Sequence, residues 1–216
     1  IPIVIVSGVD PVEAGWVKSL AHPGGNITGM SNLGGEVGPK HLEMLQAMAP
    51  RLTRVAVLVN PANPGRTALL KAVQAVAAKA NVTVLPVEAK NPQGIESAFS
   101  TMVKEKAGAV IIELDAHFIQ QRRQIAELAA KNRLPSISTF REYAEDGGLM
   151  SYGQNLADQF RHIAGIVGKI LKGAKPADLP VEQSTKLELF INRKTANALK
   201  LNISKEMLMR ADKVIE

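Results

Sequence analysis

The sequence contains no cysteine and only four histidines. The absence of cysteine excludes disulfides, thiolate metal sites and cysteine nucleophiles, and with them the two-cysteine amino-acid racemases, an α/β enzyme class of similar size. The histidines are scattered, and no two have the spacing of a helical metal-binding pair: they are His22, His41, His117 and His162. We therefore expect no metal site, and surface or capping roles for the histidines.

Signatures of nucleotide binding and of common hydrolases are also missing. The sequence has no GxGxxG, no phosphate-binding P-loop and no GxSxG nucleophile motif. No side chain is recognisable as a nucleophile with a general base beside it. We therefore expect a protein that is not an enzyme and that uses no cofactor.

Aromatic residues, runs of basic residues and long apolar runs are scarce as well. Only 4% of the 216 residues are aromatic, and although the net charge is +6, no basic run exceeds two residues, as at Arg122 and Arg123. Nucleic-acid binding needs clustered basic residues and stacking aromatics, so it is not expected. No apolar run approaches the roughly 20 residues that span a bilayer, and no export signal is recognisable at the start of the sequence.

Instead, the sequence contains apolar runs that end at polar turns and lead into helices. Residues 54–60 form such a run, followed by Asn63–Pro64, which is typical of a helix start, and by an Ala-rich helix to residue 80. The pattern returns at 107–114, which is followed by Asp115 and a helix over 117–132. A continuous apolar run is typical of a buried parallel strand. The ligand-binding groups of α/β proteins lie at the carboxyl ends of such strands, so the pattern indicates a small-molecule site.

The remaining elements extend this alternation and predict an α/β fold with parallel sheets. Further strands are expected at residues 3–6, 26–30, 82–87, 134–139, 149–152 and 187–191. Helices are expected from Asp10 to His22, around residues 42–48, from Asn91 onward and after residue 153. Gly-rich segments at 31–38 and 147–148 suggest two lobes joined by a hinge. We expect residues 35–148 to form lobe two, and residues 1–34 with 149–216 to form a discontinuous lobe one.

Several motifs, taken together and in order, resemble those of one family of proteins. They lie at residues 10–12, 22–29, 59–64, 147–153, 170–182 and 191–196. The sequence is similar over essentially its whole length to ABC-transporter substrate-binding proteins of the tryptophan/tyrosine-transport-like group. This resemblance implies a type I periplasmic-binding-protein fold, with two Rossmann-like lobes and a ligand between them. It also implies a periplasmic or otherwise extracytoplasmic location, a small-molecule ligand such as an amino acid, and an ABC permease as partner.

The resemblance also implies that lobe one is incomplete in this sequence. Such proteins normally carry an export signal and further βα units before the first strand found here, and those units would supply part of the ligand pocket. Two segments depart from the better-known aromatic-amino-acid binders: Pro61–Pro64, where they tend to have a Ser/Glu-rich turn, and Phe140–Glu142. These departures concern the ligand and leave the expected fold unchanged.

Seven residues are candidates for ligand binding, and each has a structural alternative. Asp115 could accept hydrogen bonds from a ligand ammonium or cap the helix that follows it, and Asn60 could bind a ligand carboxylate or serve as a turn residue. Ser7 and Asp10 follow the first strand, and the capping pattern around Asp10 favours a helix cap. The other three candidates are Tyr152, Arg141 and Glu142. Tyr152 could cover a ligand or pack in the hinge strand, and the alternative for Arg141 and Glu142 is an exposed ion pair of small worth.

Two functions from different classes fit these observations. The first is a solute receptor of an ABC importer that closes on an amino acid or a similar small polar molecule. The second is the effector-binding domain of a transcription regulator, which uses the same fold. The family motifs favour the receptor.

Overall fold

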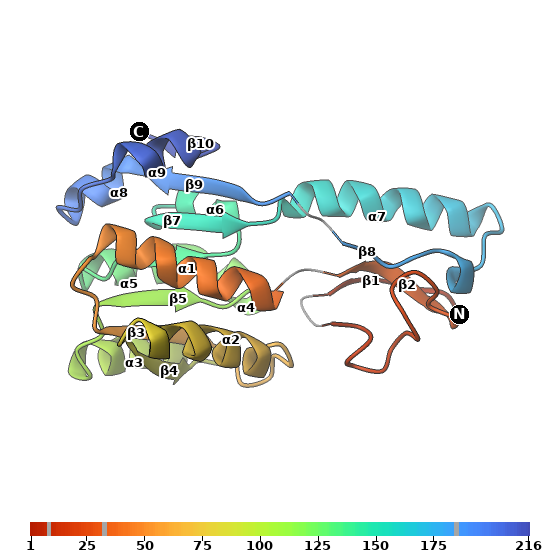
Figure 1. Cartoon of the computed structure of the whole chain (residues 1–216), viewed down its shortest axis with the longest axis horizontal. Coiled ribbons are helices and arrows are strands. Elements are labelled where there is room, and N and C mark those ends of the chain that lie inside the picture. Colours follow the sequence, from red (N-terminus) through yellow and green to blue (C-terminus); the bar gives the residue numbers. More distant parts are fainter. Residues whose placement is uncertain (8–9, 32–33, 184–185) are drawn as a thin grey trace. The chain divides into compact units, whose positions relative to one another are not determined.

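The computed structural model describes residues 1–7, 10–31, 34–183 and 186–216, with the side chains of residues 7 and 34–36 excepted. The chain forms two compact units. Unit 1 consists of Ile1–Gly34 and Gln154–Leu187, and unit 2 of Gly35–Gly153 and Glu188–Glu216. Figure 1 labels the elements of both units. In the described residues, no helix is both long enough and apolar enough to cross a membrane.

Unit 1 contains a three-stranded parallel sheet in the order β1-β2-β8. The strands are β1 (Ile3–Ser7), β2 (Ile27–Ser31) and β8 (Glu182–Gln183), and the 3-10 helix η1 (Pro176–Asp178) precedes β8. Helix α7 (Leu156–Leu171) packs against β1 and β2. One apolar stripe of this helix stays exposed: Phe160 is 60%, Val167 37% and Leu171 82% accessible.

The helix expected from Asp10 to His22 does not form. Only turns follow Asp10, and their backbone bonds include Ala14 N–H to the Asp10 carbonyl, 2.9 Å between N and O. Gly15 adopts a positive φ of 71°, a conformation that ends helical turns. The apolar side chains of this segment also lack a shared buried face, because Val12 is 39% and Trp16 is 42% exposed. The expectation was therefore wrong for this helix.

Unit 2 is built on a seven-stranded sheet in the order β10-β9-β7-β6-β5-β3-β4. Strand β3 (Arg54–Val59) pairs in parallel with the edge strand β4 (Thr83–Glu88) and with β5 (Ala109–Ile112), and β5 pairs with β6 (Ser136–Ser138). Residues 55–59 are at most 1% exposed, as expected for a strand covered on both faces. The parallel pairing predicted from these four apolar runs is confirmed.

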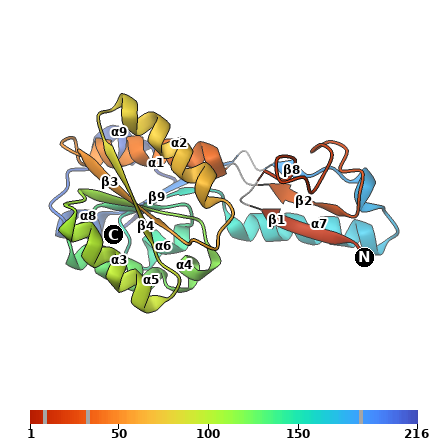
Figure 2. The ribbon, with the colours of Figure 1, turned by 90° about the horizontal axis from the view of Figure 1, so that it is seen from below.

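Helices cover both faces of this sheet. Figure 2 shows α1 (Gly34–Met48), α2 (Arg66–Lys79) and α9 (Lys205–Arg210) on one side. The other side carries α3 (Pro92–Lys104), α4 (Ala116–Gln120), α5 (Arg122–Lys131) and α6 (Arg141–Glu145). Alternate side chains of β3 point to opposite faces of the sheet. Val55, Val57 and Val59 belong to the core under α1 and α2.

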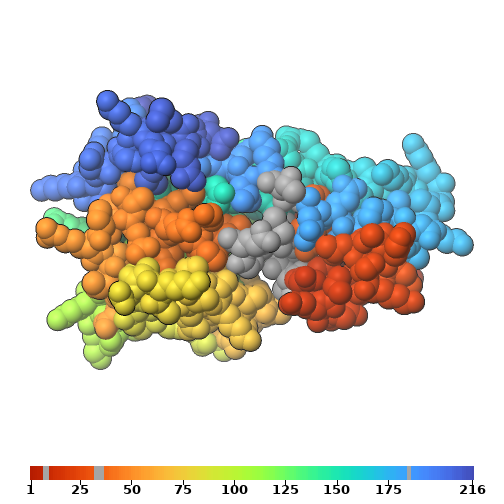
Figure 3. Space-filling model, viewed as in Figure 1, coloured from red at the N-terminus to blue at the C-terminus, as the bar shows by residue number. Residues whose placement is uncertain are grey.

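Helices α1 and α2 lie against each other on their face of the sheet (Figure 3, orange and yellow). Gly38 of α1 makes this approach possible. A Cβ atom at Gly38 would lie 2.8 Å from Leu69 Cδ1 and 3.0 Å from Val73 Cγ2. Both of these side chains belong to α2, so a larger residue at position 38 would push the two helices apart.

Two strands expected in lobe one belong to the sheet of unit 2. They are β7 (Met150–Gly153), which pairs in parallel with β6, and β9 (Glu188–Asn192), which pairs antiparallel with β7. The short α6 crossover from β6 places β7 beside that strand, and buried Met150 then lies opposite buried Ile191. The expected boundary at residue 148 is corrected for both strands.

Smaller differences concern the chain after residue 60. Helix α2 begins at Arg66, two residues later than expected, and the helix expected over 117–132 is divided into α4 and α5. Helix α6 and strand β10 (Lys213–Ile215) were not expected. Helix α8 (Arg193–Ala198) lies between β9 and α9. By contrast, α3 starts as expected, because the Asn91 side chain caps it by accepting a bond from Gly94 N–H at 2.7 Å.

Candidate functional site

The carboxyl ends of neighbouring strands β3 and β5 bring together four polar side chains: Asn60, Asn63, Glu113 and Asp115. We call them the edge cluster. Asn60 Nδ2 donates a hydrogen bond to Asp115 Oδ1 at 3.2 Å, and Asn63 Nδ2 donates to Asp115 Oδ2 at 3.2 Å. The two candidates derived from the strand ends, Asn60 and Asp115, are therefore in direct contact.

Asp115 is the acceptor at the centre of the edge cluster. It is the N-cap of α4, where its Oδ1 accepts the backbone N–H of His117 at 2.9 Å. Together with the bonds from Asn60 and Asn63, the carboxylate accepts three N–H groups. A carboxylate offers about four acceptor positions, so one position is left, on Oδ2. The residue is partly exposed, and its carboxylate also caps the helix.

The two asparagines differ in how completely they are engaged. Asn63 donates its amide hydrogens to the Leu114 carbonyl at 3.0 Å and to Asp115, and its Oδ1 accepts Gly65 N–H. Both of its amide donors are therefore used in bonds to the loop that follows β5. Asn60 donates one amide hydrogen to Asp115 and accepts Ala62 N–H on Oδ1 at 3.0 Å. One Asn60 N–H is therefore not used by these bonds, and Asn60 is both a turn residue and a possible donor.

Glu113 is a member of the edge cluster that was not among the seven expected ligand-binding residues. Its side chain is only 4% exposed, and Oε2 accepts the backbone N–H of Asn60 at 2.8 Å. Burial raises the pKa of Glu113 to about 7, and the nearby negative charge of Asp115 acts in the same direction. The bond from Asn60 and the positive charge of Arg66 lower the pKa in part. The site therefore holds one carboxyl group that changes its charge near neutral pH.

A signal for Glu113 was present in the sequence. It is the only charged residue in the apolar run 107–114, and a strand in the middle of a parallel sheet has no solvent face. A carboxyl group in such a run must be buried close to the strand end. Asn63 gave no comparable signal, because its cross-links to Leu114 and Asp115 depend on how the two loops meet.

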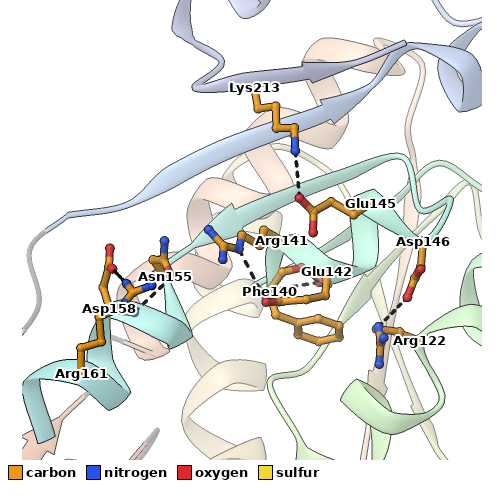
Figure 4. A network of polar contacts seen from close by, with 11 residues as sticks. Arg122, Phe140, Arg141, Glu142, Glu145, Asp146, Asn155, Asp158, Arg161 and Lys213 are labelled. Atoms are coloured by element: carbon orange, nitrogen blue, oxygen red, sulfur yellow. Dashed lines mark hydrogen bonds and ion pairs between the residues drawn. The ribbon is translucent and has the colours of Figure 1, made fainter. Parts of the chain in front are cut away.

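Arg141 and Glu142 form the first turn of α6, after the carboxyl end of β6. Arg141 Nε lies 3.6 Å from Glu142 Oε1, and the two side chains are 33% and 36% exposed. Figure 4 shows this pair beside two other ion pairs of α6 and its C-cap, Lys213–Glu145 and Arg122–Asp146. An exposed pair of this kind contributes little to stability, and its part in ligand binding stays a prediction.

Tyr152 lies in β7 and packs against the core of unit 2. Its carbonyl oxygen is 2.7 Å from Nε2 of His41, a residue that is only 1% exposed. Burial lowers the pKa of His41 to about 4, and the bond to the Tyr152 carbonyl partly opposes this shift. The geometry of Tyr152 matches the packing alternative, and its contact with a ligand stays a prediction.

The other two candidates belong to unit 1. Ser7 is the last residue of β1 and its backbone is in register with Ser31, while its side chain lies outside what the structure describes. Asp10 is exposed, and its Oδ1 accepts Val12 N–H at 2.7 Å and Glu13 N–H at 3.2 Å. Asp10 therefore caps a turn where a helix cap was expected.

Comparison with known proteins gives a consistent picture. The profile of a family described as "ABC transporter substrate binding protein" matches residues 1–215. A "Tyrosine-binding protein" of Clostridioides difficile (strain R20291) is 26% identical over 199 residues, which are 92% of this chain and 57% of that protein. The chain thus spans just over half the length of this relative.

Two solved structures are similar over nearly the whole chain. A conserved domain protein from Vibrio cholerae has a TM-score of 0.90 and 27% identity, covering 99% of this chain and 71% of that one. The ABC domain in complex with L-Trp from Streptococcus pneumoniae has a TM-score of 0.86 and 26% identity, covering 98% and 73%. These similarities confirm the expected type I periplasmic-binding-protein-like α/β fold.

Proposed function

Because the chain belongs to the family of ABC transporter substrate-binding proteins, we propose that it binds an amino acid with an aromatic side chain and delivers it to an ABC importer. The contact between Asn60 and Asp115 at the carboxyl edge of the sheet carries this proposal. Two relatives support the choice of ligand, since one is described as a tyrosine-binding protein and the other was solved with L-Trp.

In the proposed binding mode, the ligand ammonium donates a hydrogen bond to the remaining acceptor position of Asp115 Oδ2. A charge-assisted bond of this kind contributes roughly 1.5–3 kcal/mol. The remaining N–H of Asn60 suits the ligand carboxylate, so the two side chains together recognise both ends of an amino-acid backbone. Ser7 and Asp10, Arg141 and Glu142, and Tyr152 are proposed to add polar and aromatic contacts.

We propose that the functional event is a closure of the two units on the ligand. A ligand drives such a change only as far as it prefers the closed state, so residues of both units must contribute contacts. We propose that a membrane permease recognises the closed, liganded form and that the protein acts outside the cytoplasm. The alternative, an effector domain of a transcription regulator, uses the same fold but is favoured by no contact in the edge cluster.

Thermal-shift measurements against the standard amino acids test the proposal. A ligand at 100 times its dissociation constant stabilises a protein by about 2.7 kcal/mol. We expect L-tyrosine or L-tryptophan to raise the melting temperature, and glycine, which lacks the aromatic ring, to have a smaller effect. If sugars or nucleosides stabilise the protein and no amino acid does, the proposal is wrong.

A further inference from the structure

Glu113 is the one buried carboxyl group of the edge cluster, and only one of its two oxygens accepts a hydrogen bond. Its Oε2 accepts the Asn60 N–H, but no donor in the described parts of the chain reaches Oε1, which is also buried. An ionised carboxylate with an unpaired buried oxygen is costly. Inside unit 2, the negative charge of ionised Glu113 is therefore stabilised by one hydrogen bond only. The protonated form carries no charge and does not need a second donor.

The charged side chains near Glu113 do not remove the cost of ionising it. Asp115, from the loop after β5, adds a second negative charge, and Arg66 of α2 adds a positive one. Arg66 is shared with Glu88 of β4, whose Oε1 lies 3.2 Å from the guanidinium. With a pKa of about 7, Glu113 is about half protonated at neutral pH when the site is empty.

We propose that Glu113 is a positioning residue of the amino-acid site that releases its proton to solvent when an ammonium group binds beside Asp115. This inference rests on the proposed function. The bound ammonium supplies the positive charge that the cluster lacks and favours the carboxylate form of Glu113. The carboxylate in turn strengthens the charge-assisted bond to the Asn60 N–H, which fixes the loop that presents the Asn60 amide.

The expected size of the effect follows from linkage. An opposite charge within about 4–6 Å lowers the pKa of a carboxyl group by roughly 1–3 units. A fall of about two units from 7 would release roughly 0.8 proton per ligand at pH 6, about 0.5 at pH 7 and about 0.1 at pH 8. The affinity would then increase roughly tenfold between pH 6 and pH 8.

Calorimetric titration of the full-length protein with L-tyrosine and L-tryptophan tests this inference. Titrations in phosphate and in imidazole, which both buffer in this pH range and whose ionisation enthalpies differ, give the number of protons released at each pH. We expect the wild type to follow the values above and Glu113→Gln to release almost none, with an affinity that no longer depends on pH. Glu96→Gln is the control, because it removes an exposed carboxylate of α3, outside the edge cluster and away from the Arg66–Glu88 pair, and it should leave the proton release unchanged.

The outcomes separate the inference from the proposed function. Binding with no proton release, or with the same release in Glu113→Gln, overturns the role of Glu113 and leaves the amino-acid site standing. If neither amino acid binds, the proposed function fails and the inference fails with it. If Glu113→Gln does not fold, the decline of proton release from pH 6 to pH 8 in the wild type and in Glu96→Gln still decides the question.

Discussion

Lowering the pH from 7.5 to 5 should change the stability of unit 2 through two buried groups that act in opposite directions. His41 has its pKa lowered to about 4 in the folded protein, from an ordinary value of 6.5. Between pH 6.5 and pH 4, His41 is therefore mostly protonated in the unfolded chain and mostly neutral in the folded unit. Stability from the neutral histidine is present above pH 6.5 and is lost as the pH falls.

Glu113 acts with the other sign, because its pKa is raised to about 7 in the folded protein, from 4.5. Between these two values the folded unit binds the proton more tightly than the unfolded chain, so stability increases as the pH falls. From pH 7.5 to pH 5, linkage gives a loss of about 2 kcal/mol from His41 and a gain of about 2 kcal/mol from Glu113. The two effects nearly cancel in the wild type.

Two single variants should separate them. His41→Gln removes the loss, because glutamine does not titrate, while its side chain can still donate a hydrogen bond to the Tyr152 carbonyl. The free energy of unfolding of this variant should rise by about 2 kcal/mol relative to wild type on going from pH 7.5 to pH 5. Glu113→Gln should lose about 2 kcal/mol relative to wild type over the same range. Urea unfolding at both pH values measures these differences. If the variants and the wild type show parallel pH dependence, neither group has the shifted pKa and the reasoning is refuted.

Three further substitutions test the packing and capping described above, each by urea unfolding. Gly148→Ala would place a Cβ 2.1 Å from Tyr143 Cε1, so it should cost at least about 1–3 kcal/mol; an unchanged stability would contradict this packing. Gly165→Ala in α7 meets open space and should stabilise its helix by about 0.5–1 kcal/mol, whereas a loss would mean that this face is covered. Asn91→Ala removes the cap of α3 and should cost about 0.5–2 kcal/mol, while Asn91→Asp should restore most of the loss.

Strands β3 and β5 of unit 2 could be predicted from the sequence because their burial on both faces leaves continuous apolar runs. Residues 54–60 and 107–114 therefore gave β3 and β5 to within two residues at each end. The meeting of Asn60 with Asp115 followed from the same pattern, since both come after neighbouring parallel strands. The cap at Asn91 was recognisable because it depends only on local residues.

Features that depend on distant segments were missed. The pairing of β7 with β9 joins Met150 to Ile191, and nothing within either strand specifies that partner. The failed helix after Asp10 had good local capping signals, but Gly15 and the lack of a buried face outweighed them. The half-satisfied state of Glu113 depends on the exact approach of the Asn60 loop, which sequence patterns do not specify.

Calorimetric titration of Asp115→Asn against the wild type, with L-tyrosine and L-tryptophan, tests the central claim most directly. Asparagine caps helices as well as aspartate does, so α4 should form and the free energy of unfolding should fall by only about 1 kcal/mol. Loss of the charged contact to the ligand ammonium should cost about 2–3 kcal/mol, which is a weakening of roughly 30- to 150-fold. Equal affinity in the two proteins would mean that Asp115 caps α4 and does not bind the ligand.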